Sequence, residues 1–279
     1  MATHVKIDEI GYWSEIKLSI LEKYAKPYNQ IIRSHRLKSV YIDGFAGAGC
    51  HRAKGTGRLI EGSPQRALNV DPPFDTLHFV DINKARVKEL QKLVAGRPNA
   101  KVHHGDCNSI LLREIFPKIS YQNYERALCI LDPYGLHLDW RVIKSAGDSG
   151  VIEIFVNFPV MDMNMNVFWA NPERVTTASQ KRMTRFWGDE TWRNAAYAPV
   201  EGLFGPMEEK NPIDSVVDAF SKRLKTVAGF KYVPKPMPMR NSKDAIVYFL
   251  FFAAHKPVAA DIVEDIFNKY APHRGDSNG

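Results

Sequence analysis

Residues 43–49 (Asp-Gly-Phe-Ala-Gly-Ala-Gly) combine a carboxylate, an aromatic ring and closely spaced glycines. Gly47 and Gly49 lack the side chains that would keep the backbone away from a bound molecule. The segment follows a β-branched and aromatic run at 39–43, so it lies at the carboxyl end of a predicted strand, where open α/β sheets bind ligands. A glycine-rich turn can also be merely tight, so its chemistry depends on what the following strands carry.

Three further aspartates, Asp81, Asp106 and Asp132, stand at the ends of later predicted strands. Asp81 suits the hydroxyls of a ribose, and Asp106 or its neighbouring backbone can reach an adenine amino group. Each aspartate alone could be a helix N-cap, but a series of four is hard to explain in that way because aspartate is a poor strand residue. We therefore predict a nucleoside cofactor site formed by Asp43, Gly44, Phe45, Gly47, Gly49, Asp81, Ile82, Asp106 and Cys107.

The spacing of these residues argues against a nicotinamide cofactor. Gly47 and Gly49 are not followed by the third glycine of a Gly-x-Gly-x-x-Gly motif, and Asp81 comes later than the roughly 20 residues expected for the acid of that motif. An insertion at 50–62 explains part of this gap. Ser63 and Pro64, which follow the insertion, are predicted as the N-cap and the first residue of a helix.

Residues 132–135 (Asp-Pro-Tyr-Gly) form the candidate catalytic loop. They resemble the Asp-Pro-Pro-Tyr motif of amino methyltransferases, in which polar and carbonyl groups of the loop hold an exocyclic amine and the aromatic ring stacks on a flipped base. The resemblance implies catalytic roles for Asp132, Pro133 and Tyr134. The second proline is missing here, which leaves the nitrogen target open, and a plain turn with a core tyrosine is the alternative. Asn157, at the end of the fifth strand, could form the far wall of the target pocket.

Alternating strands and helices must position these residues. The predicted strands are short apolar runs that each end in a turn, and they span 39–43, 77–81, 101–104, 127–132 and 151–157. Helices between them, such as 83–94 and 108–116, give the pattern of a doubly wound α/β sheet. Runs at 230–233 and 245–251 predict an antiparallel hairpin at one edge of this Rossmann-like sheet, and a helix at 259–270 closes the fold.

This pattern divides the chain into a core with additions. We predict an N-terminal helical segment (1–38), a cofactor-binding core (39–159), a helical insertion with interleaved tryptophan and arginine (160–220), C-terminal strands and a helix that complete the core (221–270), and a flexible tail (271–279). The division places every candidate cofactor residue in one continuous part of the chain.

The net charge is +7, and 44% hydrophobic with 25% charged residues is typical of a globular protein. The positive excess fits a polyanionic partner such as RNA or DNA, although many basic enzymes have no such partner. Arg185 in the insertion, and Lys235 and Arg240 in the basic segment 221–244, are therefore candidate substrate contacts. A solvated face is the alternative explanation of that basic segment.

The three cysteines are far apart in sequence and show no zinc or disulfide pattern, so we expect free thiols in a reducing compartment. The N-terminus has no apolar signal core, and the apolar run at 245–254 is too short to cross a bilayer. We therefore expect a cytoplasmic protein that does not associate with membranes, as a monomer or a weak dimer.

Several segments, in order along the chain, resemble the three-Cys-motif partner protein family (TcmP). They are 41–49, 61–64, 79–81, 131–135 and 248–253. The resemblance implies a class I methyltransferase-like fold and a partner protein with a three-cysteine motif like that of radical-SAM enzymes, but it supplies no substrate. The glycine loop with Asp-Pro-Tyr also resembles, more distantly, bacterial adenine-N6 rRNA and DNA methyltransferases.

These observations predict a methyltransferase that uses S-adenosylmethionine, leaves S-adenosylhomocysteine, and acts on an amino group of a nucleic acid or a nucleotide-like substrate. Methyl transfer needs mostly in-line positioning, so neither a dedicated nucleophile nor a metal is expected. Two alternatives stay open. One is a non-catalytic cofactor-binding specificity subunit for the three-cysteine partner. The other is a Mg²⁺-dependent nuclease or hydrolase that uses Asp43, Asp81 and Asp132.

Overall fold

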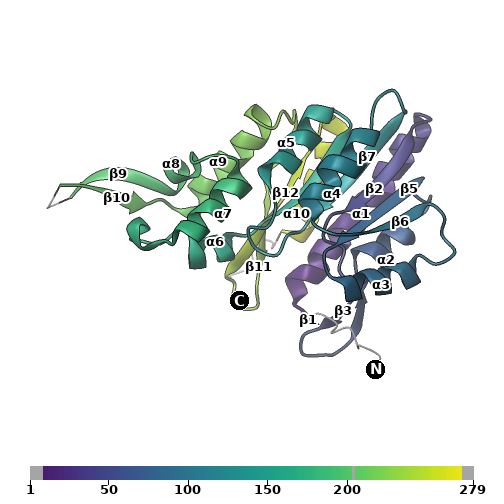
Figure 1. Ribbon diagram of the computed structural model, residues 1–279, viewed down its shortest axis with the longest axis horizontal. Helices are drawn as coiled ribbons and strands as arrows, with labels where there is room; N and C mark the ends of the chain where they lie inside the picture. Colours follow the sequence, from purple (N-terminus) through teal and green to yellow (C-terminus); the bar gives the residue numbers. More distant parts are fainter. Residues whose placement is uncertain (1–8, 203–204, 272–279) are drawn as a thin grey trace, which may run out of the picture.

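A seven-stranded sheet forms the centre of the computed structural model, which describes residues 9–202 and 205–271 (Figure 1). Its strands lie in the order β11-β12-β8-β7-β2-β5-β6. The five strands from β8 to β6 are parallel, whereas β12 is antiparallel to β8 and β11 is antiparallel to β12. In chain order the strands are β2 (Lys38–Asp43), β5 (Thr76–Asp81), β6 (Ala100–His104), β7 (Glu125–Leu131), β8 (Ile152–Phe158), β11 (Met237–Arg240) and β12 (Ile246–Ala253).

Alternate side chains of the central strands enter two separate cores. On β2, Val40 and Ile42 pack into one core and Tyr41 packs into the other, as the two-residue period of a strand requires. β7 and β8 are apolar along most of their length because both of their faces are covered. The predicted Rossmann-like sheet of the class I methyltransferase type, doubly wound and mostly parallel with an antiparallel edge, is therefore confirmed.

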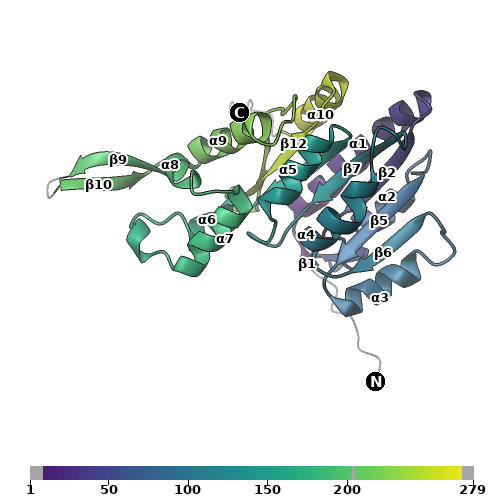
Figure 2. The ribbon, with the colours of Figure 1, turned by 45° about the horizontal axis from the view of Figure 1, so that its top comes forward.

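Helices pack on both faces of this sheet (Figure 2). The first core contains side chains of α4 (Cys107–Ile110), α5 (Trp140–Ser149), α6 (Val160–Asn166), α7 (Thr177–Trp187), α8 (Trp192–Ala196) and α9 (Ile213–Thr226). The second contains side chains of α1 (Tyr12–Ser34), α2 (Ser63–Leu68), α3 (Lys84–Leu93) and α10 (Pro257–Tyr270). α4 continues as a π-helical turn and a 3-10 turn to residue 118. The loops at the carboxyl ends of the strands thus emerge between two layers of helices.

The insertion at 50–62 folds into a hairpin of β3 (Cys50–Ala53) and β4 (Leu59–Glu61). β3 also pairs in parallel with β1 (Glu9–Ile10), which immediately precedes α1. This small sheet brings the start of α1 close to the glycine loop. The prediction that Ser63 is a helix N-cap is wrong, since Gly62 is the N-cap and Ser63 is the first residue of α2.

The antiparallel edge of the sheet differs from the predicted hairpin in one strand. Residues 230–233 contribute a single bridge, between Tyr232 and Ala254, and the edge strand is β11 instead. Met237 and Met239 are buried there, so the apolar side chains of β11 continue the core. Pro238 lies between them, and a proline is tolerated on an edge strand because no neighbouring strand needs its missing N–H.

The segment 160–220, predicted as a helical insertion, also contains a β-hairpin. β9 (Tyr197–Gly202) and β10 (Gly205–Lys210) form an antiparallel hairpin that extends away from the sheet (Figure 1). α9 also crosses the predicted boundary at 220. Trp187 and Trp192 are each only 2% exposed, so these two rings belong to the core and do not present a stacking surface to nucleic acid.

The predicted flexible tail and the predicted N-terminal helical segment lie partly outside the described residues. The tail at 272–279 and residues 1–8 of the N-terminal segment lie outside the described residues. Within the described ranges, no helix is long and apolar enough to cross a membrane.

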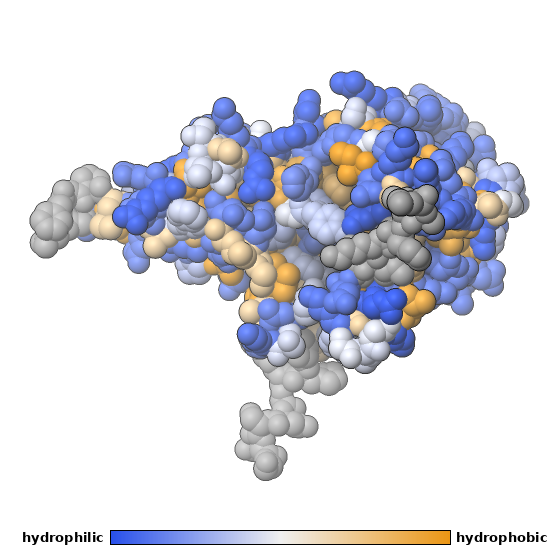
Figure 3. Space-filling model, turned by 60° about the horizontal axis from the view of Figure 1, so that its bottom comes forward, coloured by the Kyte–Doolittle hydropathy of each residue, from blue (hydrophilic) through white to orange (hydrophobic). Residues whose placement is uncertain are grey.

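Hydrophilic residues dominate the face in Figure 3, where hydrophobic residues form small groups among them. Polar and charged side chains therefore determine most contacts that this face can make.

Candidate functional site

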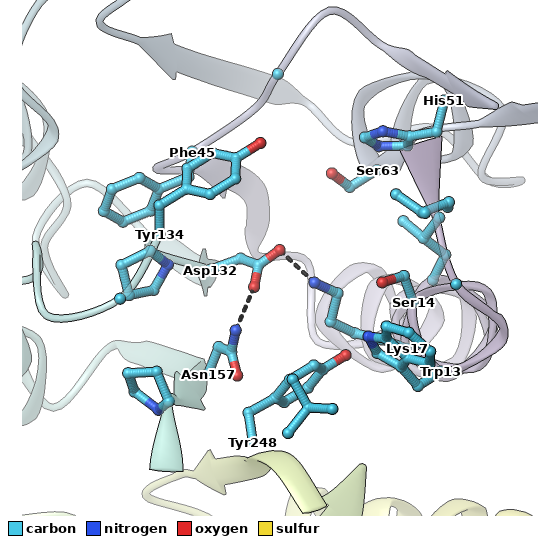
Figure 4. A pocket seen from close by; sticks show the side chains of 18 of the residues that line it. Trp13, Ser14, Lys17, Phe45, His51, Ser63, Asp132, Tyr134, Asn157 and Tyr248 are labelled. Atoms are coloured by element: carbon cyan, nitrogen blue, oxygen red, sulfur yellow. Dashed lines mark hydrogen bonds and ion pairs between the residues drawn. The ribbon is translucent and has the colours of Figure 1, made fainter. Parts of the chain in front are cut away.

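A cavity of about 890 Å³ lies at the carboxyl ends of β2, β7 and β8 (Figure 4). Its walls come from the start of α1, the β1–β3 pair, the glycine loop, the loop after β7, α6 and β12. Open α/β sheets bind ligands at this end of their strands. The lining residues used below are Lys17, Phe45, Gly47, Asp132, Tyr134, Asn157, Asp162 and Tyr248.

Asp132, the residue after β7, has both carboxylate oxygens bound by other side chains (Figure 4). Asn157 Nδ2 on β8 donates to Oδ1 at 2.8 Å, and the Lys17 ammonium on α1 donates to Oδ2. Lys17 is only 8% exposed. Burial by itself lowers the pKa of Lys17, but the adjacent Asp132 carboxylate outweighs it and holds the pKa above its ordinary value. The two groups therefore form a charged pair at the base of the cavity.

The glycine loop is held by a second buried carboxylate, Asp43 at the end of β2, which is 1% exposed. The Ser63 hydroxyl donates to its Oδ2 at 2.5 Å, and the Phe45 N–H donates to its Oδ1 at 3.2 Å. Burial raises the pKa of Asp43 to about 6, and these hydrogen bonds offset only part of that rise. Gly47 and Gly49 have φ of +68° and +83°, a region that suits glycine.

Asp81, at the end of β5, ties the glycine loop to the start of α3. Its Oδ2 accepts the Gly47 N–H at 3.0 Å and its Oδ1 accepts the Asn83 N–H at 2.7 Å. The Arg86 guanidinium lies 3.8 Å from Oδ2. Ile82, the next residue, is 70% exposed. The Asp81 carboxylate is itself only 6% exposed, so a buried carboxylate and an exposed apolar side chain are next to each other here.

The remaining predicted cofactor residues follow β6 or pack below the loop. Asp106 is the N-cap of α4, and its side chain accepts the Ser109 N–H at 2.9 Å. Cys107 is buried, and burial raises the pKa of its thiol. A Cβ on Gly44 would lie 2.8 Å from Cys107 Sγ, so glycine is needed for the chain to pass here. Asp106 thus has a capping role in the structure, as any single strand-end aspartate can.

Tyr134 lies at the cavity with 63% of its surface exposed. The alternative of a core tyrosine in a plain turn is therefore wrong. The Arg86 guanidinium lies 5.6 Å from the centre of its ring, which links the loop after β7 to α3. Gly135 has φ of +57°, and a Cβ there would lie 2.9 Å from Asp162 Oδ2. The loop backbone thus passes directly beside the Asp162 carboxylate of α6.

Only part of the predicted set lines the cavity. Phe45, Gly47, Asp132, Pro133, Tyr134 and Asn157 line it. Asp43, Gly44, Gly49, Asp81, Ile82, Asp106 and Cys107 are not part of that lining. The structure thus divides the predicted set into a cavity part around Asp132 and a glycine-loop part around Asp81.

The predicted basic substrate contacts do not line the cavity. Arg185 and Arg141 both bind Asp139, at 3.2 Å and 2.6 Å. Burial raises the pKa of Asp139, but its bonds to Arg141 and Arg185 outweigh this and lower it. Arg240 contacts Asp244 at 3.3 Å on the edge of the sheet, and Lys235 is exposed just before β11. Arg185 and Arg240 therefore have carboxylate partners of their own.

Four cavity or loop residues were missed from the sequence in these roles: Lys17, Ser63, Asp162 and Tyr248. Lys17 had a signal, because it falls on the apolar stripe of α1, three residues before Ile20 and four before Leu21. Burial raises the pKa of Tyr248 to about 12, although Lys17 lowers it in part. Asp162 follows the predicted Asn157 by five residues and Tyr248 begins the segment 248–253 that carries the family resemblance, but no local pattern marks either as a cavity residue.

Known proteins give only distant likenesses. No family model matches the chain, and no curated protein matches it. Protein LPL1258 of Legionella pneumophila, described as family DUF519, is 12% identical over 91% of this chain and 92% of its own, with a TM-score of 0.47. The methyltransferase domain of bacterial-CtHen1-CN is 12% identical over 84% and 99%, with a TM-score of 0.39. TYW2 of M. jannaschii, solved with AdoMet, is 10% identical over 87% and 75%, with a TM-score of 0.33. The fold assignment therefore rests on the strand order of this chain.

Proposed function

We propose that this protein is a methyltransferase that uses S-adenosylmethionine to methylate an amino group of a nucleic acid, RNA or DNA, or of a nucleotide-like substrate. The observation that carries the proposal is that the glycine loop and the Asp-Pro-Tyr loop line one cavity, through Phe45 and Gly47 on one side and Asp132 and Tyr134 on the other. A cofactor site and an acceptor site must meet in this way for a group to pass directly between them.

The residues around the glycine loop fit this cofactor. Asp81 accepts one backbone N–H at each oxygen, and a carboxylate has about four acceptor positions, so ribose hydroxyls can share it. Ile82 offers an exposed apolar side chain next to that carboxylate. Gly62 donates its N–H to the Gly49 carbonyl at 2.9 Å, and a Cβ on Gly62 would meet the Gly49 backbone at 3.0 Å. These contacts hold Gly49 and Gly62 close together, and Gly47 of the same loop lines the cavity.

When bound, S-adenosylmethionine would supply a methyl group carried on a positively charged sulfur. The amine nitrogen would take the methyl group and then lose one proton to solvent, while the carbon–sulfur electron pair would stay with sulfur. The chain's own part is to orient the acceptor. The exposed ring of Tyr134 can stack on a base at the cavity, and Lys17 with Asn157 fixes the side chain of Asp132. The preorganised loop lowers the entropy cost of bringing the two reactants together.

Membership of the three-Cys-motif partner family, and with it a partner protein and a cytoplasmic location, is part of the proposal. A non-catalytic cofactor-binding subunit is the second candidate. It is favoured by the engagement of both Asp132 oxygens with Lys17 and Asn157, which leaves that carboxylate less available to an acceptor. Transfer of labelled methyl groups to total RNA or DNA, with and without the three-cysteine partner, distinguishes the two. Persistent cofactor binding without transfer under both conditions would favour the subunit.

The magnesium alternative required convergence of Asp43, Asp81 and Asp132. Among the described residues, no group of three or more His, Cys, Asp or Glu side chains is arranged to hold a metal ion. Asp43 is instead bound by Ser63 and Phe45, and Asp132 by Lys17 and Asn157. The geometry that this alternative needs is therefore not found in that part of the chain.

Calorimetry with S-adenosylhomocysteine tests the cofactor assignment. We expect the wild type to bind and Asp81→Ala to bind at least about tenfold more weakly, because a charged acceptor of hydrogen bonds is lost. Asp148→Ala is the matched control, since Asp148 pairs with Lys144 on the surface of α5, and it should bind like the wild type. Thermal melting shows whether each variant is folded. Absence of binding to the wild type would overturn the proposal.

A further inference from the structure

Three buried oxygens without a hydrogen-bond partner among the described residues line the same cavity. They are Asn157 Oδ1, Asp162 Oδ2 and Tyr248 Oη. Asn157 is 9% exposed and Tyr248 is 5% exposed. A buried polar atom left unsatisfied carries a desolvation penalty that a bound partner can relieve. The cavity therefore holds polar atoms that a ligand would satisfy.

The three atoms differ in the hydrogen bonds that they can form with a ligand. The amide oxygen of Asn157 and an ionised carboxylate oxygen of Asp162 can only accept hydrogen bonds, whereas the Tyr248 hydroxyl can donate or accept. Asn157 and Asp162 therefore select a ligand that carries N–H or O–H donors. Tyr248 does not discriminate between donors and acceptors.

Asp132 is a poorer candidate for receiving the same donors. Lys17 and Asn157 already donate to its two oxygens, and the Lys17 ammonium neutralises its charge. A ligand amine would have to compete with a buried cation for Oδ2. By contrast, no cation lies within salt-bridge distance of Asp162 in the described part of the chain. Asn166 Nδ2 donates to the Asp162 Oδ1 at 2.8 Å and to its carbonyl oxygen at 3.1 Å, which leaves Oδ2 without a donor there.

Asn157 and Asp162 are also attached to opposite ends of the Asp-Pro-Tyr-Gly loop. Asn157 binds Asp132 at its first residue. Asp162 Oδ2 approaches its last residue, where a Cβ on Gly135 would lie 2.9 Å away. Tyr134, whose ring is exposed for stacking, lies in the loop between Asp132 and Gly135. The two acceptors thus flank the loop that the proposed function assigns to the methyl acceptor.

We propose that Asn157 Oδ1 and Asp162 Oδ2, rather than the Asp132 carboxylate, receive the two N–H groups of the acceptor's exocyclic amine. This inference rests on the proposed function, and it makes Asp162 a specificity-determining residue. An exocyclic amine has two N–H donors, whereas a carbonyl oxygen at the same ring position has none. The cavity therefore selects amino nucleobases over their oxo counterparts.

The variant Asp162→Asn reverses the chemistry at one atom. Asn166 holds the oxygen that faces it, so the new amide nitrogen occupies the position of Oδ2 and donates into the cavity. Glu9→Gln is the matched control, because it removes the same charge from another residue that lines the cavity without touching Asp162. The probes are adenosine against inosine and cytidine against uridine, measured by calorimetry with and without saturating S-adenosylhomocysteine.

We expect the wild type and Glu9→Gln to bind the amino member of at least one pair about tenfold more tightly than the oxo member. Asp162→Asn should bind both members within about threefold of each other, or prefer the oxo member. Equal affinities in the wild type, no measurable binding of either amino probe, or an unchanged preference in folded Asp162→Asn would overturn the inference. Loss of S-adenosylhomocysteine binding alone would overturn the proposed function, since the probe preference is also measured without it.

Discussion

The cavity part of the site around Asp132 and the glycine-loop part around Asp81 are built in different ways. Asp132 is held by side chains from α1 and β8, which are distant in sequence. Asp81 is held by backbone N–H groups of the glycine loop and of the turn into α3. The cavity part is therefore coupled to the stability of the fold, whereas the glycine-loop part depends on a local turn that the proposed cofactor would contact. Changes in the first should cost stability, and changes in the second should cost binding.

The largest effect should come from Lys17→Met, which breaks the Lys17–Asp132 ion pair of the cavity part. Removing one partner leaves a partly buried carboxylate uncompensated, so we expect the free energy of unfolding to fall by about 3 kcal/mol. Urea denaturation measures it, and Lys26→Met, at an exposed position of the same helix, is the control. Adding Asp132→Asn should recover part of the loss. Equal stability of Lys17→Met and the control would show that the pair is not coupled to folding.

A smaller effect concerns pH and Asp43. Its pKa of about 6 in the folded protein is raised from 3.8, so the folded state binds a proton at higher pH than the unfolded chain. This contribution strengthens the fold as pH falls through about 6 and is lost above it. Asp43→Asn cannot titrate, so its stability relative to the wild type should drop by about 1 kcal/mol from about pH 8 to about pH 5. A pH-independent difference would contradict the assignment.

The smallest effect on stability should come from the glycine-loop part. Ile82→Ala removes an exposed side chain, so the unfolding free energy should stay within about 0.5 kcal/mol of the wild type. The affinity for S-adenosylhomocysteine should fall about fivefold, because apolar contact area is lost. Calorimetry and urea denaturation of one preparation measure both quantities. A lower unfolding free energy of Ile82→Ala with unchanged affinity for S-adenosylhomocysteine would contradict this prediction.

Much of the fold follows from local patterns that the sequence makes visible. The apolar runs before Asp43, Asp81 and Asp132 are parallel strands because both faces of the sheet are covered, and parallel strands bring their carboxyl ends to one edge. The edge strand was predicted at the wrong residues because 230–240 contains several prolines, which obscure the strand pattern. The pairing of Met237 and Met239 with β12 determines which side chains of this segment are buried. Register at an edge depends on partners that a local pattern does not contain.

The candidate site was predictable where it is local and unpredictable where it is assembled from distant elements. Ser63 fits the expected composition of a helix start, yet its hydroxyl binds Asp43 across the glycine loop. Lys17 is marked only as a charge on an apolar stripe, and its partner Asp132 lies 115 residues away. Asp162 can be recognised as a site residue only from its contact with the backbone of Gly135. Such contacts follow from packing, which the spacing of residues within one segment does not encode.

A crystal structure with S-adenosylhomocysteine at saturating concentration is the decisive measurement, because it shows whether the cavity part and the glycine-loop part form one site. We expect the ribose hydroxyls on Asp81, the ligand along the backbone of Gly47, and its amino-acid end in the cavity that Asp132 lines. A ligand bound elsewhere, or crystals that contain none although the protein is folded, would contradict the account.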